Sequence, residues 1–319
     1  MYLGLDHGYG GNKFAYRDNE NKIKFGKKLS VFADAPQDAE DMPLFEGKRY
    51  YIGEMALMED SNSIKNNLDY KDHETMAPLS TWQVLKEENI NVNDIKKIGI
   101  GLSLAQKDYA NQFIKRLSKF TVDNEKFDLK DKIVLIPQAI GAKFAIDHLY
   151  EGENSTYAIF DIGQLTVDRV NVINGKVRKE NASGAAHDGI IKIIQELQEF
   201  IASNEEIQEH LSIKEIQEIL VSGKYIIYGE EFDFSEKIEE LKTNYTKYLI
   251  PMIKKQFNNI FKKYSKIYFV GGGSYYLDKE ETMRILGLNE KTLIFPDNAE
   301  YLNAIGNLLA AEISDKNNN

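Results

Sequence analysis

The chain has 319 residues, 42% of them hydrophobic, so it can bury a sizeable core, and its length suggests two domains. Its 40 Lys and Arg against 50 Asp and Glu give a net charge of −10, which excludes a protein whose main task is nonspecific nucleic-acid binding. The absence of cysteine excludes disulfides, zinc–thiolate sites and cysteine nucleophiles. The sequence shows no charged leader and no apolar run near the roughly 20 residues that span a bilayer. We therefore expect a soluble, cytoplasmic protein without a membrane partner.

The first half of the chain reads as strands that lead into helices. Three apolar segments separated by turn signals predict an antiparallel meander. These segments are 1–5, 11–17 and 22–33. A polar stretch at 59–74 is expected to be irregular, and the apolar spacing of 77–90 predicts a helix. Residues 95–120 and 132–150 each predict a buried strand that runs through a turn into a helix.

The pattern restarts near residue 155. Residues 156–177 read as an apolar strand, a glycine turn and an alternating strand that ends at the hairpin turn Asn174-Gly175. Further strands are expected at 218–229 and 266–270. Helices are expected at 188–203, at 234–264 and at 298–314, and a charged amphipathic stretch begins at Ser212. The last five residues, DKNNN, are expected to fray.

Both halves open with the same kind of loop, in which an apolar strand ends in aspartate and turns at a glycine two residues later. The pairs are Asp6 with Gly8 and Asp161 with Gly163. A turn without side chains after such a strand brings backbone N–H groups and a metal-linked carboxylate up to phosphates. A plain tight hairpin, with the aspartate capping the turn, is the structural alternative for either loop alone. Because there are two equivalent loops, we expect them to face one ligand.

Four features in this order resemble the actin, Hsp70 and sugar-kinase ATPase superfamily. They are Asp6 with Gly8, Gly10 and Gly11; Gln138 with Gly141; Asp161 with Gly163 and Thr166; and the cluster Gly271–Gly273. The segments GYGGNKFAY, GKRYYIGEMAL, GIGLSLAQKDYANQFIKRL and IPQAIGAKFAI are most similar to the ParM/StbA plasmid-segregation actins. The resemblance implies an α/β, actin-like ATPase fold in which two related RNase H-like domains flank a nucleotide cleft. The expected boundaries are 1–140, completed by the helix 298–314, and 141–297.

The resemblance also implies roles for the site residues. Asp6 and Asp161 would hold Mg²⁺ largely through its waters, as this ion prefers. Gln138 would orient a water for in-line attack, because an amide has no useful proton affinity at neutral pH. We therefore expect slow hydrolysis of ATP, with GTP as the alternative nucleotide. Contacts to the phosphates, ribose and base are expected from Gly8, Tyr9, Gly10, Gly11, Asn12, Lys13, Gly163, Gln164, Thr166, Gly184, Asp188, Gly271, Gly272, Gly273 and Ser274.

Several of these positions have a structural alternative or depart from the family pattern. Gln138 stands where the ParM pattern has a carboxylate, and a glutamine before a helix is frequently structural. Asp188 also reads as a helix N-cap, and Asp168 as a support of the second loop or an outward-pointing strand residue. The second loop, DIGQLTVD, carries Gln164 and Leu165 where the family has a glycine-richer turn. The five histidines lack metal-ligand spacing and are expected at the surface or lightly packed.

Two functions from different classes follow. The first is a filament-forming ATPase whose subunits stack head to tail when nucleotide closes the cleft. Plasmid DNA would then be moved through a DNA-binding, ParR-like adaptor, because an acidic filament repels DNA. The second is a small-metabolite kinase, which needs a carboxylate base beside the γ-phosphate, with Asp161 and Asp168 as its only candidates. An Hsp70-like regulator ranks behind both, because there is no appended peptide-binding domain.

Overall fold

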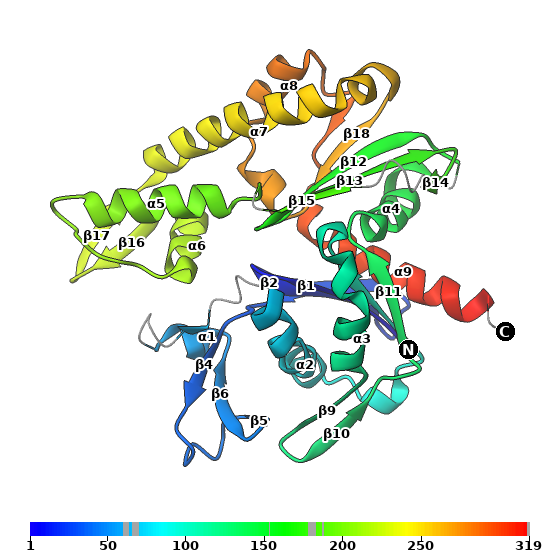
Figure 1. Cartoon of the computed structure of the whole chain (residues 1–319), viewed down its shortest axis with the longest axis vertical. Helices are drawn as coiled ribbons and strands as arrows, with labels where there is room; N and C mark the ends of the chain where they lie inside the picture. Colours follow the sequence, from blue (N-terminus) through cyan, green and yellow to red (C-terminus); the bar gives the residue numbers. More distant parts are fainter. Residues whose placement is uncertain (60–63, 66–69, 153, 178–182, 187, 318–319) are drawn as a thin grey trace.

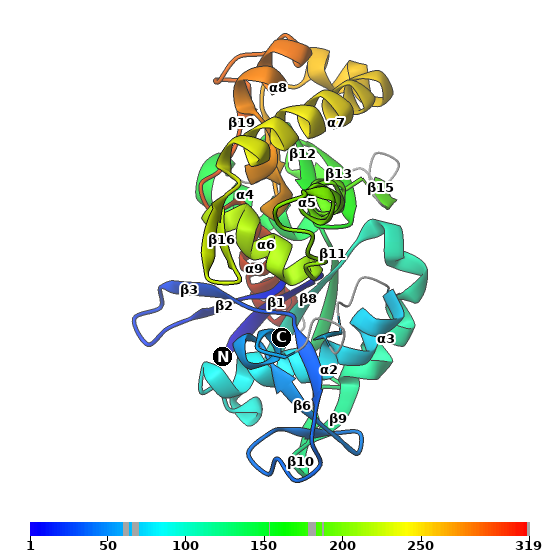
Figure 2. The same cartoon turned by 90° about the vertical axis from the view of Figure 1, so that its left-hand side faces the viewer.

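The computed structural model describes residues 1–59, 64–65, 70–152, 154–177, 183–186 and 188–317. Two bodies lie one above the other along the long axis of the molecule, each built on its own β-sheet (Figures 1 and 2). None of the helices in these residues is long and apolar enough to cross a membrane.

The first sheet has the strand order β11-β8-β1-β2-β3. Its strands are β1 (Tyr2–Gly8), β2 (Gly11–Arg17), β3 (Ile23–Lys28), β8 (Lys97–Leu102) and β11 (Ile133–Pro137). β1, β2 and β3 form the predicted antiparallel meander, and β8 and β11 are parallel to β1. The parallel pairs place the carboxyl ends of β1, β8 and β11 at one edge of the sheet.

The second sheet repeats this plan with the order β14-β13-β12-β18-β19, and β15 pairs with β13. Its strands are β12 (Tyr157–Ile162), β13 (Thr166–Ile173), β14 (Lys176–Val177), β15 (Ser183–Ala186), β18 (Ile267–Val270) and β19 (Leu293–Ile294). β12 and β13 are antiparallel, whereas β18 and β19 continue the sheet in parallel. The duplication expected from the sequence is therefore confirmed.

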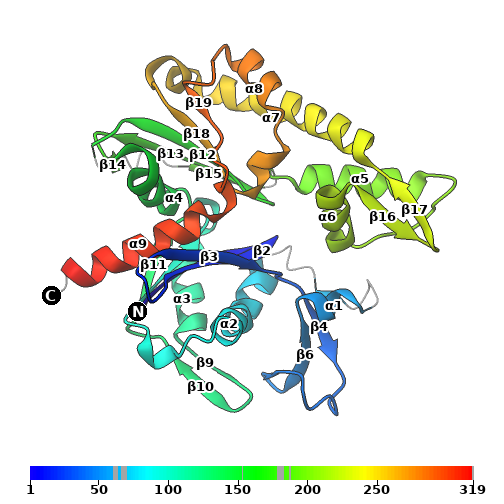
Figure 3. The ribbon, with the colours of Figure 1, turned by 180° about the vertical axis from the view of Figure 1, so that it is seen from behind.

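Two helices lie between the sheets, α4 (Ile140–Ile146) and α9 (Leu302–Asn317), as the view from behind shows (Figure 3). Their buried small and aliphatic residues form one cluster with the facing strands of the second sheet. The two helices touch through glycine, because a Cβ on Gly306 would lie 1.6 Å from the carbonyl oxygen of Gly141. A Cβ on Gly4 of β1 would likewise lie 2.1 Å from the carbonyl oxygen of Ala304. The packing of α9 against α4 and β1 therefore requires glycine at these positions, because the backbones are in direct contact.

The remaining elements extend each body away from this junction. In the first body they are α1 (Glu54–Leu57), α2 (Tyr70–Glu87), α3 (Ala110–Ser118), and a sheet of β4 (Phe32–Ala35), β5 (Leu44–Phe45), β6 (Lys48–Ile52), β7 (Ile64–Lys65), β9 (Lys119–Val122) and β10 (Glu125–Asp128). In the second body they are α5 (Ile191–Ser203), α6 (Ile213–Ser222), α7 (Ser235–Lys263), α8 (Lys279–Leu286) and the hairpin of β16 (Lys224–Ile227) with β17 (Glu230–Asp233). Each body has its own apolar core.

Three predicted elements differ from the structure. The strand expected at 218–229 is wrong for 218–222, which belong to α6; the capping box of Ser212 and Glu215 starts that helix, and only 224–227 form a strand. The irregular stretch expected at 59–74 is wrong where β7 and the first turn of α2 lie, while 60–63 and 66–69 fall outside the described residues. The expected fraying is wrong for Asp315 and Lys316, which continue α9, because Tyr2 donates a 2.9 Å hydrogen bond to Asp315.

Candidate functional site

A cavity of about 450 Å³ lies between the two bodies. It is lined by the loop after β1, the loop after β12, the first turn after β18, and one face of α6. Both halves of the chain therefore contribute walls, as expected for equivalent loops that face one ligand. The volume is within the range of roughly 300–1,000 Å³ that is typical of small-molecule sites.

Asp6 and Asp161 line this cavity from the carboxyl-terminal parts of β1 and β12. Both are almost fully buried. Gln138 follows β11 and donates a 2.7 Å hydrogen bond from Nε2 to Asp6 Oδ1. Burial raises the pKa of Asp161 to about 6, and the charge of Asp6 adds to this. A buried carboxylate with a second carboxylate beside it favours a cation close to both.

Asn303 of α9 ties the second carboxylate to the helix between the domains. Its Nδ2 donates to Asp161 Oδ2 at 2.6 Å. Its Oδ1 accepts from the backbone N–H groups of Ala139 and Ala142, both at 3.1 Å. Asn303 is buried, so each of these bonds satisfies a group that water does not reach. A residue 142 positions away from Asp161 therefore orients it.

The first loop has no room for a side chain at Gly8. A Cβ on Gly8 would lie 2.7 Å from Lys13 Nζ, and Lys13 stands opposite Asp6 in the β1–β2 register. Tyr9 is held from the side by a stacked contact with His73, whose ring centroid is 4.7 Å away, and by a hydrogen bond from Gln106 to its hydroxyl. The main chain of this loop and the side chain of Lys13 therefore both line the cavity.

The second loop closes on itself, because Gly163 N–H donates to the carbonyl of Thr166 at 2.8 Å. Asp168, three residues after Leu165, does not line the cavity; its carboxylate accepts from Ser103 Oγ at 2.9 Å and from the N–H of Leu104 at 3.2 Å. Burial raises the pKa of Asp168 to about 8, with the charge of Asp161 contributing. Since Ser103 follows β8, this contact joins the second loop's strand to the first body.

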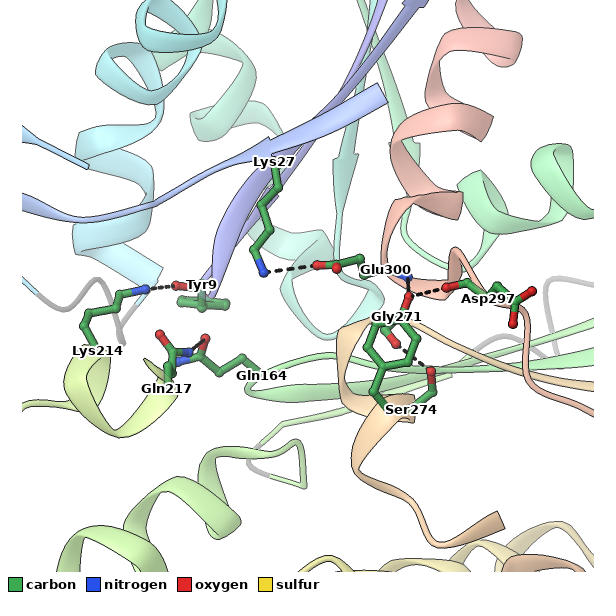
Figure 4. A network of polar contacts seen from close by, with 10 residues as sticks. Tyr9, Lys27, Gln164, Lys214, Gln217, Gly271, Ser274, Asp297 and Glu300 are labelled. Carbon is green, nitrogen blue, oxygen red and sulfur yellow. Dashed lines mark hydrogen bonds and ion pairs between the residues drawn. The ribbon is translucent and has the colours of Figure 1, made fainter. Parts of the chain in front are cut away.

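Two cationic side chains in the cavity escaped the sequence analysis. Lys214 is buried on α6, and its Nζ donates to the backbone carbonyl of Tyr9 at 3.3 Å (Figure 4). Burial lowers the pKa of Lys214 to about 7, and the charges of Lys27 and Lys13 lower it further. Lys27 pairs with Glu300 across 3.1 Å. Together with Lys13 they make three ammonium groups around one cavity, which suits a ligand with several negative charges.

The structure brings most of the expected residues together but not all. Those that line the cavity are Asp6, Gly8, Tyr9, Gly10, Lys13, Gln138, Asp161, Gly163, Gln164, Thr166, Gly271, Gly272 and Gly273. Those described residues that do not are Gly11, Asn12, Asp188 and Ser274. Gly184 pairs with Asp168 in the β13–β15 register. Asp188 instead accepts a 2.9 Å hydrogen bond from Tyr248 of α7, and Ser274 donates one to the carbonyl of Gly271 at 2.7 Å.

Other lining residues were missed: Lys27, Ser103, Gln106, Lys214, Gln217, Glu218, Tyr275, Tyr276, Glu300 and Asn303. A signal for part of this set was present, because Ser212 and Glu215 form a capping-box pattern that predicts a helix. On that helix Lys214, Gln217 and Val221 share one face. No local pattern distinguishes Asn303.

The histidines required a correction. His7 and His73 are buried rather than at the surface, and burial lowers the pKa of each to about 4. They lie behind the first loop, where Thr81 and Asn12 contact the ring nitrogens of His7. His187 lies outside the described residues. Among the described residues no group of three or more His, Cys, Asp or Glu is placed to hold a metal ion.

The donor set nevertheless fits Mg²⁺ bound together with a phosphate ligand. Asp6 and Asp161 supply hard oxygen ligands from opposite walls, and Mg²⁺ usually keeps several waters and takes further oxygens from phosphates. A magnesium ion without such a ligand has too few protein oxygens here. The two carboxylates would hold the ion through its water shell.

The comparisons with known proteins agree on the architecture. A family model described as the C-terminal part of the archaeal actin homologue MreB-like matches residues 159–281. The subunit of a 15-stranded ParM filament from Clostridium botulinum superposes with a TM-score of 0.73 at 20% identity, over 98% of this chain and 99% of that one.

Two further structures are similar. Ta0583, an archaeal actin homologue solved also as a complex with ADP, gives a TM-score of 0.76 at 21% identity, over 98% of this chain and 99% of that one. Bacillus thuringiensis ParM with ATP gives a TM-score of 0.60 at 16% identity, over 98% of each chain. No curated protein sequence matches the chain. The two-domain arrangement around the cavity is therefore that of the actin-like fold.

Proposed function

We propose that the cavity binds a nucleoside triphosphate with Mg²⁺, and that the chain hydrolyses it slowly and assembles head to tail into filaments. The observation that carries this proposal is the pair of strand–Asp–Gly loops on opposite walls of one cavity, surrounded by three lysines. Such loops suit phosphate groups, and the lysines neutralise their charge. By their descriptions, one solved structure of the same fold is a complex with ADP, another is bound to ATP, and a third is a filament.

The residues suggest a division of labour. Backbone N–H groups of both loops and the ammonium group of Lys13 bind the phosphates, while Mg²⁺ would neutralise charge on their oxygens. Gln138 is anchored by its Nε2 to Asp6, so its carbonyl oxygen remains available to accept a hydrogen bond from a water. An amide orients water but does not take its proton. Hydrolysis should therefore be slow, which suits a polymer in which the bound nucleotide times disassembly.

We further propose plasmid segregation as the cellular role, with a DNA-binding, ParR-like adaptor at the filament end. Support comes from the sequence segments that resemble ParM and from the similarity to two ParM structures. The net charge of −10 favours an adaptor over direct DNA binding. ATP is the proposed nucleotide and GTP the alternative.

A kinase needs a carboxylate base that faces the acceptor. Asp168, one of the two candidates, is buried outside the cavity lining, where it accepts from Ser103 and Leu104. The other, Asp161, already accepts from Asn303 and is needed for the metal. Since neither is free to act as the base, the geometry favours water as the acceptor.

The test is light scattering with sedimentation of purified protein in Mg-ATP, Mg-GTP, a non-hydrolysable triphosphate or no nucleotide. We expect nucleotide-dependent pelleting that is lost in Asp161→Ala and retained in Asp38→Ala, an exposed aspartate of the first body. Soluble protein in every condition, with phosphate transferred to an added metabolite, would overturn the filament proposal and support the kinase.

A further inference from the structure

One face of α6 contacts both loops. Lys214 Nζ donates to the carbonyl of Tyr9 at 3.3 Å, and Gln217 Nε2 donates to Gln164 Oε1 at 2.7 Å (Figure 4). Lys214 and Gln217 are three residues apart and therefore lie on the same face of the helix. α6 is thus bonded to a loop of each domain, and the β16–β17 hairpin follows it directly in the chain.

The backbone carbonyl of Gln164 is held in place by the start of α5. Ile191 N–H at the start of α5 donates to its carbonyl at 2.9 Å, and a Cβ on Gly189 would lie 2.3 Å from the same oxygen. The residue as a whole is only 9% exposed. Gln164 Oε1 lies 2.7 Å from where a Cβ on Gly10 would stand. The Gln164 amide therefore occupies the narrow space between the first and the second loop.

This amide has one unused donor. Gln217 donates to its oxygen, which leaves Nε2 without a hydrogen-bond partner among the described residues although it is buried. A buried donor without an acceptor is costly, and a phosphate oxygen is the strongest acceptor that the proposed ligand offers.

We propose that Gln164 senses the terminal phosphate of a bound nucleoside triphosphate and transmits its presence through Gln217 to α6. This inference rests on the proposed nucleotide binding. The proposed binding places the phosphates between the two loops, and a diphosphate lacks the terminal one. A triphosphate satisfies Gln164 Nε2 and holds the amide pair in place, whereas a diphosphate leaves the donor unpaired. The two nucleotides therefore differ in their interaction with α6, as any ligand-driven shift requires.

The experiment measures two quantities on purified protein in Mg²⁺. The first is the dissociation constant for ADP and for a non-hydrolysable ATP analogue, by calorimetry. The second is hydrogen exchange of residues 213–233 with each ligand bound. The variants are Gln164→Gly, which removes the amide, Gln164→Glu, which keeps its shape but cannot donate when ionised, and Gln217→Ala, which separates the amide from α6.

We expect Gln164→Gly to lose about tenfold in affinity for the triphosphate with little change for ADP, because one hydrogen bond to a charged group is lost. Gln164→Glu should lose more, since its charge repels the phosphate. The triphosphate should protect 213–233 beyond ADP in the wild type but not in Gln164→Gly or Gln217→Ala. Unchanged ADP affinity shows that the variants are folded.

Three results would overturn the proposal, and only the last of them also refutes the proposed function. An equal loss for both nucleotides, or protection that persists in Gln164→Gly, refutes sensing while nucleotide binding stands. Failure of the wild type to bind either nucleotide refutes the proposed function and the inference together.

Discussion

Replacing Gly306 by alanine should separate the two helices that join the domains. Gly306 lies in α9, where alanine is favoured over glycine by about 1 kcal/mol because it restricts the unfolded chain and exposes less backbone. The site itself forbids the methyl group, since a Cβ would lie 1.6 Å from Gly141 O and 2.4 Å from its carbon. These atoms belong to the backbone of α4 and cannot rotate away.

The steric cost outweighs the helix propensity. An ordinary contact needs roughly 3.5 Å, so α4 and α9 would have to move apart by roughly 2 Å. Overpacking of a rigid core costs about 1–3 kcal/mol and occasionally more. The separation would also stretch the bonds from Asn303 to the N–H groups of Ala139 and Ala142, each worth about 1 kcal/mol. We expect a net loss of about 3 kcal/mol in the free energy of unfolding.

Urea unfolding followed by circular dichroism measures this loss. The slope of the unfolding free energy against urea concentration should be the same in the variant and the wild type, which confirms that both undergo the same transition. Lys316→Ala, at an exposed position of the same helix, is the control and should change stability by less than about 0.5 kcal/mol. A Gly306→Ala protein as stable as the wild type would show that the helices are not in backbone contact, and the account of the junction would be wrong.

Three further changes test the electrostatics and the hydrogen bonds of the site, by urea unfolding without nucleotide. Burial lowers the pKa of Lys214 from 10.5 in the unfolded chain to about 7 in the folded protein, so the charged lysine destabilises the fold most below pH 7. The variant Lys214→Met should therefore be more stable than the wild type below pH 7, and this difference should vanish as the pH rises through 10.5. A difference that does not depend on pH would contradict this reasoning. Burial raises the pKa of Asp168 from 3.8 in the unfolded chain to about 8 in the folded protein, so the ionised carboxylate destabilises the fold most above pH 8. The variant Asp168→Asn should therefore be as stable as the wild type below pH 4 and more stable than the wild type above pH 8. A higher stability of the variant at low pH would contradict this reasoning. Asn303→Ala should cost about 2–4 kcal/mol, because it leaves Asp161 and two backbone donors unpaired, and a loss under 1 kcal/mol would show that they find other partners.

The sheets could be predicted because their pattern is local. β1, β2 and β12, β13 each alternate or run apolar over a few residues and are separated by turn residues. The start of β16 was misplaced because the run Ile219–Val221 suits a strand and a buried helix alike. Only the cap at Ser212 decides between them, and it lies seven residues earlier.

The two aspartates of the site could also be predicted, but Asn303, the hydrogen-bond partner of Asp161, could not. Asp6 and Asp161 end apolar strands and precede glycine turns, which is visible within ten residues of sequence. Asn303 reaches Asp161 only because α9 returns between the domains, and nothing in its own neighbourhood marks it. Lys27 is similarly brought to the cavity by register, since β3 pairs with β2 so that Lys27 lies beside Lys13.

Glycine shows why the site was predicted only in part. A glycine in a sequence says that a side chain is not tolerated, but not whether a ligand or a helix takes the space. Gly272 leaves its space to the cavity, whereas Gly141, which the sequence analysis named together with Gln138, leaves its space to α9, where a Cβ would lie 2.6 Å from Asn307 Oδ1. Substitution by alanine distinguishes glycines that face the cavity from glycines that pack against another helix. At Gly272, where a Cβ would meet nothing closer than 3.6 Å, alanine fits the protein and obstructs only the ligand, while at Gly306 it obstructs the fold.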